Sequence, residues 1–121
     1  MHGDFRLDNV LFRPDGEIVV LDYQGLSRGR PGMDVAYFIT TALTIEHREQ
    51  EDRLLGAYHE ALVTAGISSY SREMLQDDCR LAKEALAHRI VGAADVLDTE
   101  ITADEESLID VMQLRVLDWL D

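Results

Sequence analysis

The stretch His2-Gly-Asp-Phe-Arg-Leu-Asp-Asn-Val-Leu-Phe-Arg-Pro-Asp-Gly-Glu-Ile-Val-Val-Leu-Asp22 carries the strongest structural signal in this chain of 121 residues. Two short runs of β-branched and aromatic residues, 9–13 and 17–22, flank Pro14-Asp15-Gly16. The proline presets φ for a turn, and the glycine tolerates a positive φ. The pattern predicts a β-hairpin that returns the chain to its first loop, with Asp22 at the end of the second strand.

The rest of the sequence predicts one helix after another. Asp34 precedes an apolar run and is a good N-cap, and Gly66 stops the helix that follows. Ser71 caps a long helix, and Thr102-Ala-Asp-Glu105 is a capping box for the last one. We expect helices over about 35–43, 47–65, 72–98 and 102–120.

We therefore predict an α+β fold that is mostly α, with a small β-hairpin and a bundle of about four helices. Residues 1–121 form a single domain, in which 1–31 hold the loops and hairpin and 32–121 the helical part. The long helix carries an apolar stripe at helical spacing, and so does the helix before it. The stripe of the long helix is Leu75, Cys79, Ala82, Leu86, Ile90, Ala93 and Leu97. That of the preceding helix is Leu54, Tyr58, Ala61, Leu62 and Ala65, and further core candidates are Tyr37, Phe38 and Trp119.

The chain is acidic, with 24 Asp and Glu against 11 Lys and Arg and a formal net charge of -13. This charge repels nucleic acids and anionic membranes, so we expect neither as a partner. The apolar share of 46% and charged share of 29% are typical of a globular domain. The single cysteine, Cys79, excludes an internal disulfide, and no apolar run approaches the ~20 residues that a membrane span needs. We expect a cytoplasmic protein.

The chemistry-bearing residues lie in and around the hairpin. Asn9 follows Asp4 by five positions, which is the Asp-to-Asn spacing of the protein-kinase catalytic loop, with Gly3 where Arg is usual. Phosphoryl transfer needs a carboxylate that orients the acceptor hydroxyl and takes its proton, and Asp4 suits that task. It also needs oxygen ligands that hold Mg²⁺ against the triphosphate, for which Asn9 and Asp22 are candidates. The hairpin is expected to bring these three side chains together.

A second segment, Gly29-Arg-Pro-Gly-Met-Asp-Val-Ala-Tyr-Phe38, extends the pattern. With His-Gly-Asp-x-x-x-x-Asn, the hairpin and the strand ending in Asp, it resembles the aminoglycoside phosphotransferase and choline-kinase-like small-molecule kinases, closest to their ecdysteroid-kinase-like branch. The resemblance implies a protein-kinase-like C-terminal lobe that uses Mg²⁺ with ATP (or GTP). It implies Asp4 as catalytic base, Asn9 and Asp22 as metal ligands, and His2 and Asp34 as supports of the catalytic loop.

The resemblance also implies an N-terminal lobe with a phosphate-covering loop, a lysine for the phosphates and a paired glutamate, which would precede the His-Gly-Asp motif. Only Met1 does so here, and the only lysine is Lys83, within the long helix. We expect a C-lobe alone, with negligible turnover by itself, because positioning and charge stabilisation supply most of the catalysis. The complete enzyme would phosphorylate a hydroxyl of a small molecule. The alternative is a non-catalytic helical binding or dimerisation module derived from such a kinase.

Several roles stay open at the level of sequence. Arg6 could reach a phosphate or pair with Asp8. Asp34 can cap its helix and brace the loop at once. The acidic group Asp95, Asp98 and Glu100 could recognise a cationic substrate or form a solvated face. An apolar surface left by the absent lobe predicts self-association into a homo-oligomer.

Overall fold

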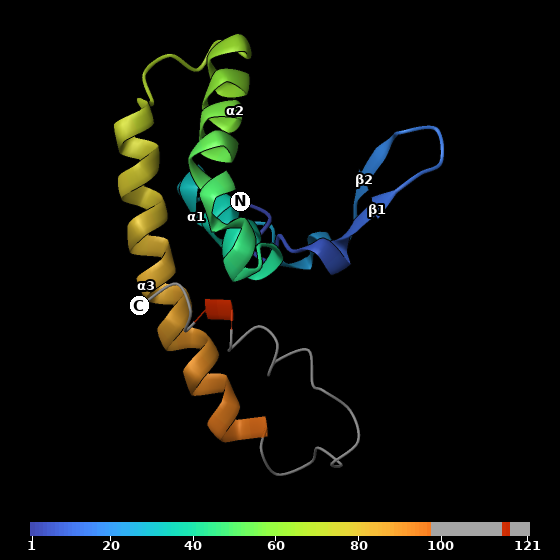
Figure 1. Ribbon diagram of the computed structural model, residues 1–121, viewed down its shortest axis with the longest axis vertical. Helices are drawn as coiled ribbons and strands as arrows, with labels where there is room; N and C mark the ends of the chain where they lie inside the picture. Colours follow the sequence, from blue (N-terminus) through green and yellow to red (C-terminus); the bar gives the residue numbers. More distant parts are fainter. Residues whose placement is uncertain (98–114, 117–121) are drawn as a thin grey trace.

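The computed structural model describes the backbone of residues 1–97 and 115–116, and the side chains of residues 1–88, 115 and 116. In this part of the chain, three α-helices and a two-stranded antiparallel sheet are joined by loops and 3-10 turns (Figure 1). The prediction of a mostly helical α+β fold is confirmed. The elements are β1 (Val10–Phe12), β2 (Ile18–Val20), α1 (Pro31–Ala42), α2 (Glu51–Thr64) and α3 (Arg72–Leu97), with 3-10 turns at Leu7–Asn9, Tyr23–Gly25 and Ile45–Gln50.

The predicted hairpin forms from β1 and β2, with Val10 opposite Val20. Gly16 adopts the positive φ of 87° that the turn requires. The backbone N–H of Glu17 donates to Asp15 Oδ1 at 3.0 Å, which closes the turn on its strand side. The hairpin projects from the helical body (Figure 1). Its base, rather than its tip, therefore meets the rest of the fold.

Helix α1 begins at Pro31, three residues earlier than the predicted N-cap at Asp34. A proline at the first helical position has a favourable φ and loses no hydrogen bond, because its N–H would have no helical partner. Arg30 occupies the N-cap position and makes no side-chain capping bond. The N-cap prediction for Asp34 is therefore wrong. Asp34 lies inside the first turn, where its carboxylate is free to bind another segment.

Helix α2 is shorter than predicted, because residues 45–50 form a 3-10 turn before it. Its end is as predicted, with Gly66 at a φ of 89°. The predicted apolar stripe is correct only in part: Tyr58 packs against the core and Leu62 is half-buried, but the leucine that enters the core is Leu55 and not Leu54. Leu55 is buried with 4% of its surface exposed, whereas Leu54, Ala61 and Ala65 are exposed.

Helix α3 begins as predicted, with the Met74 N–H donating to Ser71 Oγ at 3.1 Å. It packs chiefly against α1, and the shared core also takes one residue from α2. That core is Val35, Ala36, Ile39, Leu55, Leu75, Cys79 and Ala82. The first four residues of the predicted α3 stripe are thus buried, and the last three lie outside the described side chains.

The predicted last helix, 102–120, lies outside the described residues apart from Arg115 and Val116, which are helical. Val116 is buried against Ala87 of α3, and the Arg115 guanidinium donates to the Thr41 carbonyl near the end of α1. Trp119 lies outside the described residues. In the part of the chain that is described, no helix is both long enough and apolar enough to cross a membrane.

Candidate functional site

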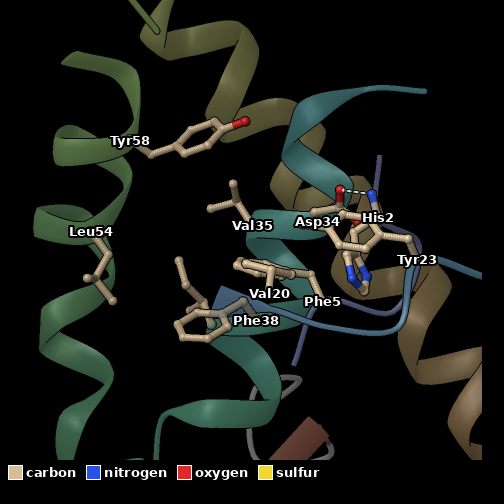
Figure 2. A pocket seen from close by; sticks show the side chains of 10 residues that line it. His2, Phe5, Val20, Tyr23, Asp34, Val35, Phe38, Leu54 and Tyr58 are labelled. Atoms are coloured by element: carbon tan, nitrogen blue, oxygen red, sulfur yellow. Dashed lines mark hydrogen bonds between the residues drawn. The ribbon is translucent and has the colours of Figure 1, made fainter. Parts of the chain in front are cut away.

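The carboxylate of Asp34 binds the first loop of the chain through two consecutive backbone N–H groups. The His2 N–H donates to Asp34 Oδ2 at 2.6 Å, and the Gly3 N–H donates to Asp34 Oδ1 at 2.9 Å. Figure 2 shows Asp34 on α1 reaching toward His2. An ionised carboxylate has two acceptor oxygens, so it can accept a hydrogen bond from each of these N–H groups at once. The first turn of α1 therefore fixes the backbone immediately before Asp4.

His2 connects this loop to the end of β2. Its Nε2 lies 2.8 Å from the Leu21 carbonyl oxygen, and its Nδ1 lies 3.3 Å from the Asp4 amide nitrogen. A carbonyl oxygen can only accept and an amide N–H can only donate, so Nε2 carries the proton and Nδ1 accepts. The ring is buried and packs beside Tyr23, with centroids 5.0 Å apart. With both nitrogens engaged, His2 orients the loop and is not placed to act as a base.

Asp4 is held by three other side chains. Asn9 Nδ2 donates to Asp4 Oδ2 at 3.0 Å and to the Asp4 carbonyl at 2.8 Å, and Arg6 Nε lies 3.3 Å from Asp4 Oδ1. Tyr37 of α1 also hydrogen-bonds this carboxylate. Burial alone would raise the pKa of Asp4, but the bonds from Tyr37 and Asn9 and the charge of Arg6 outweigh it, so the pKa is lowered. About a quarter of the side chain, 24%, stays exposed, so an ionised, oriented carboxylate remains accessible.

Asn9 and Asp22 both lie at the base of the hairpin, where Asn9 is bonded to Leu21, the residue before Asp22. The Leu21 N–H donates to the Asn9 carbonyl at 2.8 Å, one step beyond the Val10–Val20 pair, so Asp22 follows immediately. Asp22 adopts a left-handed conformation, with φ 60° and ψ 66°, and its exposed carboxylate accepts a bond from Gln24 Nε2 at 3.2 Å. Among residues 1–88, Asp22 makes no hydrogen bond with Asp4 or Asn9, and no group of three His, Cys, Asp or Glu side chains could hold a metal. The structure thus joins Asp4 to Asn9 directly and places Asp22 beside them along the backbone.

Two further contributors to the site have no signal in the spacing of the motif. The first is Tyr37, which looks like an ordinary core residue, although it lies three residues after Asp34 and so shares its helix face. The second is Gly25, which packs against Gly3. A Cβ on Gly3 would lie 2.6 Å from the Gly25 carbonyl oxygen, and a Cβ on Gly25 would lie 2.9 Å from the His2 carbonyl oxygen. The backbone of the loop that follows Asp22 therefore touches the backbone of the Asp4 loop.

A cavity of about 390 Å³ lies beside these loops, between α1 and α2 (Figure 2). Its walls are mainly apolar and aromatic, and it reaches the loop through His2 and Phe5. Asp4 is not among the described residues that line it. The lining also includes Val20, Tyr23, Val35, Phe38, Ile39, Leu54 and Tyr58.

The remaining sequence candidates are placed as follows. Arg6 pairs with both Asp4 and Asp8, the latter at 3.3 Å, so its guanidinium is shared between the two carboxylates. The lone cysteine is buried in the core, as predicted. The acidic candidates for a cationic substrate, Asp95, Asp98 and Glu100, lie outside the residues whose side chains are described.

Comparison with known proteins places this chain in a family. The family model of the ecdysteroid kinase-like family matches residues 1–68, which is more than half of the chain and includes the Asp4 loop, the hairpin, α1 and α2. No curated protein and no solved structure matches the chain significantly. The matched segment carries the motifs on which the resemblance to small-molecule kinases rests, and that resemblance is confirmed. The chain belongs to the ecdysteroid kinase-like family.

Proposed function

We propose that this chain is the C-terminal lobe of an ATP- and magnesium-dependent phosphotransferase that phosphorylates a hydroxyl of a small molecule. The observation that carries the proposal is the environment of Asp4. Its carboxylate is fixed by Asn9, Arg6 and Tyr37, and Asp34 fixes the backbone of the two residues before it, yet the carboxylate remains partly exposed. Phosphoryl transfer relies on positioning of this kind more than on covalent chemistry.

Asp4 is proposed to orient the acceptor hydroxyl by accepting its hydrogen. Because the pKa of Asp4 is lowered, the group stays ionised at neutral pH but is a weak base. A weak base suits a loose transition state, in which the nucleophile needs little activation before the phosphoryl group departs from its donor. The proton therefore moves to Asp4 late in the reaction. Tyr37 and Asn9 hold the carboxylate in place while this happens.

Asn9 and Asp22 are proposed to hold Mg²⁺. Their donor atoms, an amide oxygen and a carboxylate, are the hard oxygen ligands that this ion prefers, and one carboxylate adds only one negative charge next to a nucleotide. Asn9 uses its Nδ2 for Asp4, which leaves Oδ1 as the ligand atom. Two protein ligands are sufficient, because Mg²⁺ takes most of its other ligands from water and phosphates. When bound, the ion would neutralise charge on the transferring phosphate.

The isolated chain is proposed to bind nucleotide weakly and to turn over very slowly. Lys83, the only lysine, is paired with Glu51 at 2.6 Å between α3 and α2, and is thus not available to the phosphates. The family resemblance assigns phosphate contacts to an N-terminal lobe. We expect calorimetry with ATP and Mg²⁺ to detect no micromolar binding, and micromolar affinity would contradict this part of the proposal.

The metal assignment can be tested with Mg²⁺ alone. We expect millimolar Mg²⁺ to shift the NMR signals of the Asn9 side-chain amide and the Asp22 backbone amide, and Asp22→Asn to abolish the shift. Asp15→Asn is a matched control, because Asp15 is an exposed carboxylate in the same hairpin that binds a backbone N–H. Shifts that survive in Asp22→Asn, or that disappear in Asp15→Asn, would refute the proposed ligands. Asp4→Asn in the complete gene product should abolish transfer to any hydroxyl acceptor that it phosphorylates.

A second candidate function is a non-catalytic helical module that associates with a partner or with itself. Exposed apolar side chains on the hairpin favour it, since Phe12 is 62% and Ile18 is 60% exposed. The loop after the hairpin adds Leu26, which is 67% exposed. Phe12 and Ile18 face each other across the two strands, and paired exposed apolar side chains of this kind favour an interaction surface. We expect light scattering to detect a homo-oligomer at high concentration that Phe12→Ser weakens, whereas a strictly monomeric chain would count against self-association.

A further inference from the structure

Helix α3 packs tightly against the first turn of α1 at Asp78. A Cβ on Gly32 would lie 2.6 Å from Asp78 Cβ and 3.2 Å from the Cys79 backbone nitrogen. The Cys79 Sγ–H also donates to the Gly32 carbonyl, at 3.4 Å. Any larger residue at position 32 would clash with α3, so the glycine allows the two helices to pack this closely here.

Asp78 is a buried carboxylate, with 5% of its surface exposed, and it bridges two partners. Arg30 Nη1 donates to Asp78 Oδ1 at 2.6 Å, and the Tyr70 hydroxyl donates to Asp78 Oδ2 at 2.7 Å. Burial raises the pKa of Asp78, but the bonds from Tyr70 and Arg30 outweigh it and the pKa is lowered. The carboxylate therefore stays charged, and a buried charge strongly resists losing one of its partners.

Asp78 contacts two segments of the chain that continue into the candidate site. Arg30 ends the segment 22–30, every residue of which is exposed and which begins with the proposed metal ligand Asp22. Gly32 lies in the helical turn that carries Asp34, the carboxylate that binds the His2 and Gly3 N–H groups. Asp78 thus binds the end of segment 22–30 and packs against the helical turn whose Asp34 holds the Asp4 loop.

We propose that Asp78 is a positioning residue for phosphotransfer. It acts through Arg30 on the segment that carries Asp22, and through the first turn of α1 on Asp34 and the Asp4 loop. The proposal rests on the phosphotransferase function proposed above. It differs from a purely structural tie between two helices, because breaking the Arg30–Asp78–Tyr70 bridge should loosen the site while the core stays intact.

Amide hydrogen exchange of the whole chain measures this difference at two reporters. The Gly3 N–H, bound to Asp34, reports on the Asp4 loop, and the Ser27 N–H, bound to the Met1 carbonyl at 3.0 Å, reports on segment 22–30. We expect Arg30→Gln to speed exchange at both by about tenfold, which corresponds to about 1.4 kcal/mol of local stability, and Tyr70→Phe to act in the same direction. Each variant leaves the Asp78 carboxylate one of its two partners, so the fold should survive.

Arg72→Gln is the matched control. Arg72 belongs to the same helix and pairs with Asp52 at 2.6 Å, but this pair ties α3 to α2 and not to α1. Exchange at Gly3 and Ser27 should be unchanged in Arg72→Gln. The proposal is overturned if Arg30→Gln and Tyr70→Phe leave both reporters unchanged, or if Arg72→Gln accelerates them equally.

A second readout separates this proposal from the function on which it rests. In Arg30→Gln we expect the Mg²⁺ concentration that half-shifts the Asn9 side-chain amide to rise severalfold. Faster exchange in a chain that shows no Mg²⁺ response even without substitution would refute the phosphotransfer role and leave only a structural tie. A clear Mg²⁺ response whose midpoint and reporters are unaffected by Arg30→Gln would refute the positioning role and leave the proposed function standing.

Discussion

Replacing Asp34 by asparagine tests the anchoring of the Asp4 loop. The two oxygens of Asp34 each accept one backbone N–H, at 2.6 Å from His2 and 2.9 Å from Gly3. An asparagine of the same shape offers one oxygen and one NH₂ group. One of the two backbone N–H groups must then face the NH₂ group, which is itself a donor. The other N–H group binds a neutral amide oxygen in place of a charged carboxylate oxygen.

The size of the effect follows from these bonds. A hydrogen bond to a charged group contributes about 1.5–3 kcal/mol, and a negative charge in the first turn of a helix about 0.3–1 kcal/mol. One charged bond is lost, one is weakened and the favourable charge at the start of α1 disappears. We therefore expect Asp34→Asn to lower the free energy of unfolding by about 3 kcal/mol.

Urea denaturation followed by circular dichroism measures this loss. The control is Asp15→Asn, because Asp15 accepts a single backbone N–H, from Glu17 at 3.0 Å, in an exposed turn. We expect the control to cost less than about 1 kcal/mol. If Asp34→Asn costs no more than the control, the two bonds do not anchor the loop and the reasoning fails.

Three other predictions concern the core and the buried ionisable groups. Burial raises the pKa of the Cys79 thiol to about 11, so thiol reagents at pH 8 should modify the folded chain far more slowly than the urea-unfolded chain; equal rates would contradict the buried position. The pKa values of Asp4 and Asp78 are lowered in the folded chain, so their contribution to stability is present above the ordinary carboxyl range near pH 4 and is lost as the pH falls below it. Urea titrations at pH 3 and pH 7 should show this loss. Leu75 is fully buried, and Leu75→Ala should cost about 2–5 kcal/mol, whereas Leu81→Ala on the exposed side of the same helix should cost less than about 1 kcal/mol.

The hairpin and the long helix could be predicted from sequence because their signals are local. Pro14-Asp15-Gly16 contains the conformational preferences of the turn, and the spacing of Leu75, Cys79 and Ala82 defines one helix face. The leucine of α2 that enters the core could not be predicted in this way. Leu54 and Leu55 are adjacent apolar residues, and only the position of α1 and α3 decides which of them is buried.

The candidate site shows the same division. The spacing of Asp4 and Asn9 predicts their proximity, and the structure joins them by a hydrogen bond. Local rules assigned Asp34 to its own helix, but a carboxylate near a helix start can serve N–H groups of another segment instead, and sequence does not distinguish the two. The role of Tyr37 could not be predicted, because a buried aromatic residue has the same sequence pattern whether or not its hydroxyl binds a carboxylate.

The contact between Gly3 and Gly25 limits how this part of the chain can change over evolution. A Cβ atom added at either position would clash with main-chain atoms of the opposite segment, and no second substitution can remove main-chain atoms. A change at either position therefore has no compensating change at the other, unlike most tight contacts between side chains. We expect selections for suppressors of Gly25→Ala to return reversion to glycine and no replacement at position 3.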